Sequence, residues 1–198
     1  ALAYALMSHR RQRVDLAEAE AVAEEADGHP MFIDELVRHA ALLDRPGRER
    51  LDLGEVLWSR ISRLDTIQQR ILELVALAGT PIDNESLARA LGITFAELHR
   101  QVAVLRAASL VRAMGTRGTD RVEPYHDRVR HAVASKLDDA RRRSVHQSLA
   151  RAIEASEHPD AETLAVHYRL AGDTSQAASY ATRAAETASR ALAFEHAA

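Results

Sequence analysis

Two short segments carry residue types that are suited to binding a nucleotide. Residues 28–38 read GHPMFIDELVR, and residues 125–130 read YHDRVR. The ring of Pro30 is rigid and has no amide proton, so it can present an apolar face to a purine base. His126 directly precedes a predicted helix. Because a helix N-terminus attracts anions, a histidine there can donate a hydrogen bond to a phosphate.

Both segments also have a purely structural interpretation. Gly28 can end one helix, and Pro30 can occupy the first position of the next. Asp127 can cap the helix that follows, with His126 packed locally. The residues alone leave both interpretations open for each segment.

The residue patterns of common catalytic sites are missing from the chain. A phosphate-binding P-loop needs glycines and a lysine, whereas Lys136 is the only lysine and has no glycine near it. The kinase patterns His-Arg-Asp and Asp-Phe-Gly and the hydrolase pattern Gly-x-Ser-x-Gly do not occur either. There is no cysteine, and the ten histidines include no His-x-x-x-His pair. We therefore expect that this chain alone is not an enzyme and holds neither a metal nor a cofactor.

Composition predicts a mainly α-helical chain. Hydrophobic residues make up 46% of the 198 residues, which is enough for a core, and aromatic residues only 4%. Alanine and leucine are abundant, which favours helices. No apolar stretch approaches the roughly 20 residues that span a bilayer, and there is no signal peptide. We expect a cytoplasmic protein with no membrane partner, and the net charge of -3 argues against nonspecific binding of nucleic acid.

Apolar residues recur at helical spacing along most of the chain. Asp15 and Thr94 are expected to cap helices, and Arg45, Pro46 and Gly47 to break one. Helices are predicted from Leu16 to Ala26, Pro30 to Ala40, Leu53 to Leu64, Ile67 to Val75, Asn84 to Leu91 and Thr94 to Leu105. More are expected near residues 126–137, 139–156, 160–171 and 174–190.

One β-hairpin interrupts this helical pattern. Residues 110–114 and 121–125 are short extended runs, and the glycine-containing segment between them turns the chain. Three helices followed by a hairpin is the order of elements in a winged helix. We therefore predict a winged-helix domain with a small β-hairpin.

The end of the chain contains one unit that is similar to a tetratricopeptide helix pair. Glycine supplies the turn in such a pair, and small alanines let the two antiparallel helices approach closely. An ordinary helical hairpin is the alternative. The matching residues are Tyr168, Gly172, Ala177, Ala181 and Ala184.

Together, these segments resemble the signal-transduction ATPases with numerous domains. The closest similarity is to large bacterial serine/threonine protein kinases that carry such an ATPase followed by tetratricopeptide-like repeats. In that family a Gly-x-Pro opens a helix of the lid over the P-loop domain, which Gly28 and Pro30 match. A winged helix then ends in a histidine–aspartate pair that touches the bound diphosphate, which His126 and Asp127 match. The resemblance covers nearly the whole chain, but the P-loop half and a kinase domain are not in it.

The resemblance implies a regulatory fragment of a nucleotide-switched signalling protein. Residues 1–50 would be a helical lid remnant, residues 51–137 a winged-helix domain, and residues 138–198 the start of tetratricopeptide-like repeats. Gly28, Pro30, His126 and Asp127 would contact ATP or ADP, held with magnesium in the parent protein, which would be an ATPase and a serine/threonine kinase. The partners would be the P-loop ATPase domain of the same parent and a protein bound by the repeats. The chain starts without methionine and ends within a helical pattern, so we expect it to be cut from a longer protein.

Two other classes of function are compatible with this sequence. The parent could be an ATP-dependent LuxR-type transcription regulator whose DNA-reading domain lies beyond Ala198, or the repeats could form a pure protein-interaction scaffold. DNA binding by this fragment is not expected, because the candidate recognition helix, residues 94–106, carries few positive charges.

Overall fold

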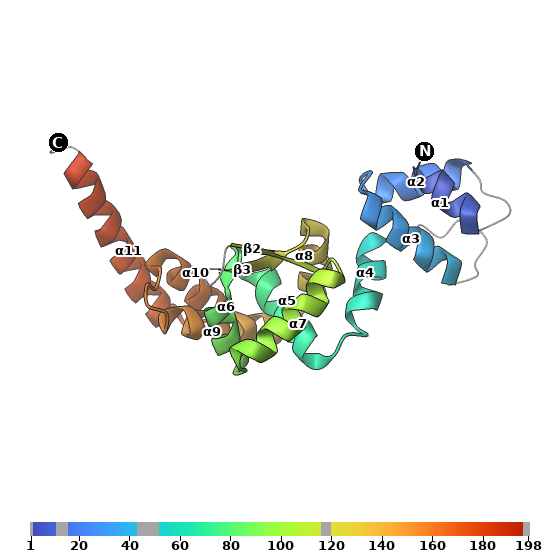
Figure 1. Ribbon diagram of the computed structural model, residues 1–198. Coiled ribbons are helices and arrows are strands. Elements are labelled where there is room, and N and C mark those ends of the chain that lie inside the picture. Colours follow the sequence, from blue (N-terminus) through green and yellow to red (C-terminus); the bar gives the residue numbers. More distant parts are fainter. Residues whose placement is uncertain (1, 11–15, 43–51, 116–119, 196–198) are drawn as a thin grey trace. The chain divides into compact units, whose positions relative to one another are not determined.

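The structure, a computed structural model, describes residues 2–10, 16–42, 52–115 and 120–195. These residues form eleven helices and three short strands (Figure 1). The chain divides into two compact units, Ala1–Leu64 and Asp65–Ala198. The expectation of a mainly α-helical chain with one small β element is confirmed.

The N-terminal unit is built from four helices. In the described residues these are α1 (Leu2–Arg10), α2 (Leu16–Glu25), α3 (Pro30–Leu42) and α4 (Leu53–Ile61). The first three contact one another, and α4 packs against α3. The buried positions of α3 and α4 repeat at the spacing of one helix face. They are Phe32, Ile33, Leu36 and Val37 on α3, and Leu53, Val56, Leu57 and Ile61 on α4.

Two polar contacts hold the ends of α4 in this unit. At its start, the backbone N–H of Leu53 donates to Oε1 of Glu25 at the end of α2, at 3.2 Å. Near its other end, Arg60 forms a salt bridge with Glu35 of α3, with an N–O distance of 3.1 Å. Both contacts join residues more than 20 positions apart, so they tie α4 to helices that precede it in the chain.

The C-terminal unit contains the sheet and the remaining helices. Its first part comprises α5 (Thr66–Leu77), β1 (Ile82–Asp83), α6 (Asn84–Leu91), α7 (Phe95–Ala107), β2 (Val111–Met114) and β3 (Arg121–Pro124). Its second part comprises α8 (Asp127–Ala134), α9 (Asp139–Glu154), α10 (Ala161–Ala171) and α11 (Thr174–Glu195). These bounds agree with the helices and the hairpin predicted in this region.

Helix α5 forms the centre of this unit. It contacts α6, α7, α8, α9 and β3. Because it is surrounded in this way, it buries apolar side chains on several faces instead of along one stripe. Its buried apolar residues are Ile71, Leu72, Leu74, Val75 and Ala76.

The three strands form an antiparallel sheet in the order β1–β3–β2. Val122 in the central strand pairs with Ile82 on one side and with Ala113 on the other. On the hairpin, Arg112 and Glu123 lie opposite each other and form a salt bridge at 2.7 Å. The sequence predicted β2 and β3 but not β1, because a strand of two residues is too short to show alternation.

Acidic and hydroxyl side chains begin most helices of the C-terminal unit. Such a side chain accepts a hydrogen bond from a backbone amide of the first helical turn, which would otherwise lack a partner. The predicted cap Thr94 is confirmed, with Oγ1 accepting from the N–H of Glu97. Asp15 and the break at Arg45, Pro46 and Gly47 lie outside the described residues. The capping aspartates of this unit are Asp65, Asp83, Asp138, Asp160 and Asp173.

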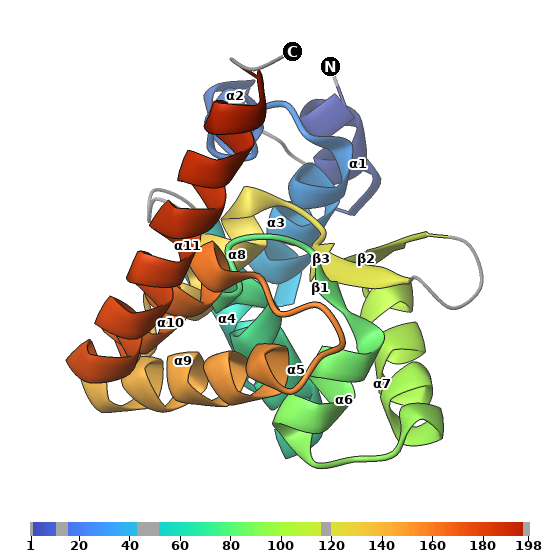
Figure 2. The ribbon, with the colours of Figure 1, turned by 90° about the vertical axis from the view of Figure 1, so that its left-hand side faces the viewer.

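Among the last three helices, α10 packs against both α9 and α11 (Figure 2). The chain reverses between α10 and α11 at Gly172, whose φ of 90° is in the left-handed region that favours glycine. A separate apolar cluster holds the three helices together. It consists of Ala150, Leu164, Tyr168, Ala177 and Tyr180.

The division into two units differs from the predicted domain boundaries. The first unit ends at Leu64 and contains α4, so it extends beyond the predicted boundary at 50/51. The predicted boundary at 137/138 falls inside the second unit, where α9 contacts both α5 and α6. A functional division into domains 1–50, 51–137 and 138–198 stays a prediction.

Candidate functional site

The Gly28–Pro30 segment is a tight connection between α2 and α3. Asp27 and Gly28 both have positive φ, at 51° and 69°, and they end α2. The N–H of Gly28 donates to the carbonyl of Ala23 at 2.9 Å, which satisfies an acceptor in the last turn of α2. Pro30 is the first residue of α3, where its missing amide proton leaves no bond unmade. The structural interpretation of these two residues is therefore confirmed, and their role toward a nucleotide stays a prediction.

The residues that follow Pro30 anchor the start of α3. The ring of His29 lies 4.7 Å from the ring of Phe32, which is almost fully buried. Glu35, one turn further on, forms the salt bridge to Arg60 described above. These side chains serve the packing of the N-terminal unit, while Gly28 and Pro30 themselves are exposed.

The His126–Asp127 segment departs from the expected arrangement in one respect. His126, not Asp127, occupies the N-cap position of α8, with extended backbone dihedral angles of -154° and 156°. Its ring Nδ1 accepts a hydrogen bond from the N–H of Arg128 at 3.2 Å. Asp127 is the first residue of the helix, and its carboxylate forms a salt bridge with Arg130 at 3.2 Å. The prediction that Asp127 caps this helix is therefore wrong, because an N-cap acceptor must precede the first helical residue.

This cap assigns the proton on the imidazole of His126. A neutral imidazole carries one proton, and the nitrogen that accepts a hydrogen bond cannot be the one that carries it. Because Nδ1 accepts from Arg128, the neutral ring has its proton on Nε2. The side chain can thus cap the helix through one nitrogen and act as a donor through the other.

The predicted site residues therefore form two local pairs. Gly28 and Pro30 lie in one turn of the N-terminal unit, and His126 and Asp127 are adjacent at the start of α8 in the C-terminal unit. A single nucleotide contacted by all four residues stays a prediction of the family resemblance.

A cluster around Glu154 was not predicted from the sequence. The hydroxyl groups of Tyr168 and Tyr180 each donate to one carboxylate oxygen of Glu154, both at 2.5 Å. The two rings lie nearly parallel with their centroids 5.6 Å apart, and the guanidinium of Arg183 lies 4.9 Å from the centre of the Tyr180 ring. The cluster ties α9 to α10 and α11 through a single carboxylate.

The hydrogen bonds of this cluster change the acidity of its members. Donation by both tyrosines stabilises the carboxylate and lowers the pKa of Glu154 below 4.5. Burial and the hydrogen bond to Glu154 raise the pKa of Tyr168 well above 10, and the same hydrogen bond is the main reason why the pKa of Tyr180 is raised. The carboxylate is therefore ionised and both hydroxyls are protonated at neutral pH.

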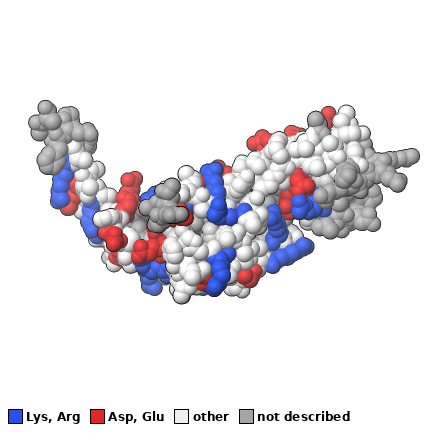
Figure 3. All heavy atoms as spheres, viewed as in Figure 1, with Lys and Arg blue, Asp and Glu red and all other residues white. Residues whose placement is uncertain are grey.

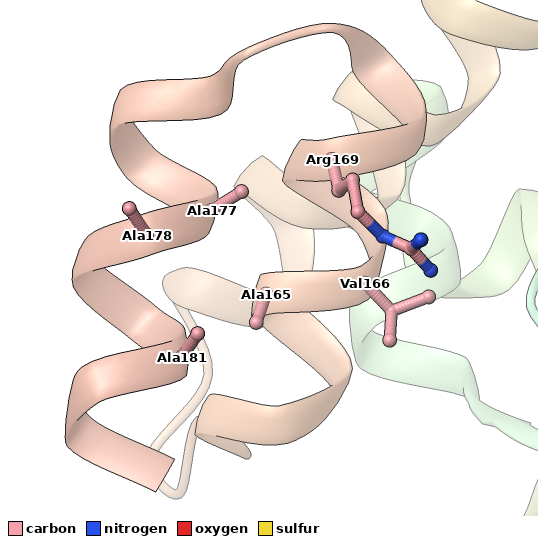
Figure 4. A pocket seen from close by; sticks show the side chains of 6 residues that line it. All are labelled: Ala165, Val166, Arg169, Ala177, Ala178 and Ala181. Carbon is pink, nitrogen blue, oxygen red and sulfur yellow. The ribbon is translucent and has the colours of Figure 1, made fainter. Parts of the chain in front are cut away.

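A shallow groove of about 290 Å³ lies between α10 and α11 (Figure 4). Small apolar side chains form most of its wall, and Arg169 is its one charged lining residue. The exposed face of α10 beside it also carries Leu170. The groove is lined by Ala165, Val166, Arg169, Ala177, Ala178 and Ala181.

Positive charge on the candidate recognition helix α7 is limited. Arg100 forms a salt bridge with Glu97 on the same helix, and Arg112 of the hairpin is paired with Glu123. Arg106 borders a small cavity of about 100 Å³, which is also lined by Asp120. On the face drawn in Figure 3, basic and acidic side chains are interspersed over the C-terminal unit. This distribution resembles an ordinary solvated surface more than a phosphate-binding stripe.

Comparison of the chain with models of protein families, with curated proteins and with solved structures gives no match. Within the ranges that the structure describes, no group of three or more metal-ligating side chains comes together. Among the same residues, no helix has the length and apolar character needed to cross a membrane.

Proposed function

We propose that this chain is a regulatory region of a nucleotide-switched signalling protein. Residues 1–50 are the remnant of an ATPase lid, residues 51–137 a winged helix, and residues 138–198 the start of tetratricopeptide-like repeats. The region transmits the ADP or ATP state of an ATPase core to helices that bind a protein partner. The chain itself performs no catalysis in this proposal, and the parent protein is an ATPase linked to a serine/threonine kinase.

The order of elements in the C-terminal unit carries this proposal. Helices α5, α6 and α7 precede the β2–β3 hairpin, and β1 joins the hairpin along β3. Because β1 directly precedes α6, this pairing attaches the hairpin to the start of α6, as expected for a wing beside a helical core. The next helix begins directly after β3 with His126 at its cap, which is where the resemblance expects the histidine that touches a diphosphate.

The pair α10–α11 supports the repeat-like part of the proposal. Gly172 makes the turn, and Ala177 lies in the contact between the two helices. The groove along this pair offers apolar surface with Arg169 at its side, which would suit an apolar partner segment that carries an acidic residue. A pure scaffold function would use this same surface without any nucleotide.

The nucleotide role is tested at His126 in the longer protein that the proposal requires. A hydrogen bond to a charged group contributes about 1.5–3 kcal/mol, so its loss should speed ADP release roughly 10- to 150-fold and raise basal output. Both His126→Ala and His126→Ser should show this effect, because serine keeps the helix cap but lacks the imidazole donor. If ADP release is normal in the serine variant, the imidazole does not hold the nucleotide.

A second measurement uses the chain alone. The proposal assigns the phosphate-binding P-loop to the ATPase core, so the isolated chain should show no ATP or ADP binding in calorimetry with magnesium present. Micromolar binding would mean that the nucleotide site lies within these 198 residues and that the proposed division of labour is wrong.

A further inference from the structure

Two buried histidines face each other between α9 and α10. The Nδ1 atoms of His146 and His167 are 3.1 Å apart, and the ring centroids are separated by 5.3 Å. Only 7% of His146 and 3% of His167 is exposed. A histidine in water takes up its second proton as the pH falls through about 6.5. A buried pair of histidines in contact is expected to take up protons at a different pH from a histidine on the surface.

The hydrogen bond between the rings limits where the protons lie in the neutral pair. A bond between two Nδ1 atoms requires that one of them carries a proton and that the other does not. One ring is therefore protonated on Nδ1 and donates, and the other is protonated on Nε2 and accepts. One proton lies between the two rings, and there is no room for a second.

The charged groups around the pair do not offset an added positive charge. On α9, Arg142 acts on His146, and its guanidinium donates to the carbonyl groups of Ala134 and Leu137. The acidic residue of α5 and that of α6 are each paired with an arginine. Glu73 of α5 is paired with Arg141, and Glu85 of α6 with Arg89.

We propose that His146 and His167 form an acid-sensitive latch, which holds α10 to α9 while the pair shares one proton and opens when both rings become protonated. Two imidazolium groups would bring two N–H donors together at Nδ1, so the bond between the rings would be lost. The latch concerns the response of this chain to pH and does not depend on the proposed nucleotide role.

The lowered pKa values of the two histidines support the proposed latch. Burial is the main reason why the pKa of His167 falls from 6.5 to about 4, and the proximity of His146 lowers it further. Burial and the charge of Arg142 also lower the pKa of His146. Because the unfolded chain takes up protons near pH 6.5 and the folded chain does not, stability is fully present above pH 6.5 and is lost between pH 6.5 and about pH 4. For His167 alone, the folded-to-unfolded ratio should fall about 30-fold between pH 7.5 and pH 5.

The first test follows the imidazole nitrogens of the whole chain by ¹⁵N NMR during a pH titration. We expect His167 to stay neutral at pH 5.5, and in the neutral pair we expect one ring to be protonated on Nδ1 and the other on Nε2. Titration of both buried rings near pH 6.5, the ordinary value of a histidine in water, would overturn the proposal.

The second test measures unfolding and hydrogen exchange at pH 7.5 and pH 5. His146→Gln should fold with a smaller acid-induced loss of stability, and it should reduce the acid-induced rise in amide exchange, corrected for the intrinsic rate, over residues 161–171. His158→Gln serves as a matched exposed control and should behave as the wild type. If His146→Gln keeps the full loss, or the wild type is equally stable at both pH values, the pair is not a latch. Should the variant fail to fold, the NMR titration of the wild type still decides the question.

Discussion

The family resemblance links His126 to phosphate binding. In the structure, His126 also caps helix α8 and so contributes to the local fold. Its Nδ1 accepts from the N–H of Arg128, so His126→Ala removes the side-chain acceptor at the start of α8. Loss of an N-cap acceptor typically costs about 0.5–2 kcal/mol, and we expect a loss in this range. Denaturant unfolding of the isolated chain measures it.

His126→Ser is the matched control for this prediction. Serine is a preferred N-cap residue and should restore most of the stability lost in the alanine variant. Equal stability of the alanine variant and the wild type would mean that the ring nitrogen contributes nothing to α8.

Glu154 joins three helices through two tyrosine hydroxyls, so replacing it should loosen the end of the C-terminal unit. Glu154→Gln should lower the free energy of unfolding by about 1 kcal/mol at pH 7. This value is smaller than that of a buried hydrogen bond to a charged group, because the carboxylate is exposed to solvent. The lowered pKa of Glu154 means that this stabilisation is present above pH 4.5 and is lost as the pH falls further. The difference between wild type and variant, measured by urea unfolding, should therefore shrink at pH 3.

The exposed Glu157 provides the control, because its side chain forms no hydrogen bond or ion pair with the described residues. Glu157→Gln should leave stability unchanged. If Glu154→Gln does the same at pH 7, the two tyrosines hold the helices without help from the carboxylate.

The structural roles of single residues were the hardest feature to predict from the sequence. The turn at Gly28 and Pro30 could be predicted, because local backbone chemistry determines it. At Asp127 the sequence suggested the wrong cap, because aspartate is the more usual capping residue and the start of α8 is decided by the strand before it. His146 and His167 are separated by 21 positions, so only the packing of two helices reveals that their rings meet.

The turn between α10 and α11 has a backbone conformation that strongly favours one residue type. Gly172 has a φ of 90°, and a Cβ atom built there would meet nothing within 4 Å. Gly172→Ala should therefore destabilise the chain by about 1–2 kcal/mol through backbone strain alone, without a steric clash. Thermal unfolding followed by circular dichroism measures the loss.

Gly172→Asn makes this prediction more specific. Asparagine tolerates the left-handed region better than alanine, so its variant should be the more stable of the two. The opposite order would show that contacts of the new side chain, and not φ, control this position.

Most helices were predictable from the sequence because their apolar residues repeat along one face. The buried positions of α4 and the cap of α7 at Thr94 are examples in which local pattern and tertiary packing agree. Strand β1 was missed because Ile82 gains its strand conformation from pairing with Val122, which lies 40 positions later. Strand pairing over such a separation leaves no periodic signal in the sequence.

For the whole molecule, the distribution of charge is the property that best indicates whether the chain binds nucleic acid. We expect no specific DNA complex of this chain, because Arg100 and Arg112 are already paired near the candidate recognition helix. Specific complexes typically reach about 10⁻⁸ M or better at physiological salt, and selection from a random DNA library followed by a gel shift would detect one. A reproducible DNA motif bound at that strength would instead favour the transcription-regulator alternative.

The two contacts that hold α4 bear on how this chain can vary in evolution. Glu25 bonds the first turn of α4 and Glu35 its last turn, so α4 is positioned by α2 and α3 as well as by the chain that leads into it. The entropic cost of closing a connection grows only slowly with its length, by about 0.6 kcal/mol for each doubling. Homologues should therefore accept insertions between α3 and α4 while they retain the acidic residue at each of the two positions. Among homologues, the length of this connection should then vary while the positions of Glu25 and Glu35 stay acidic.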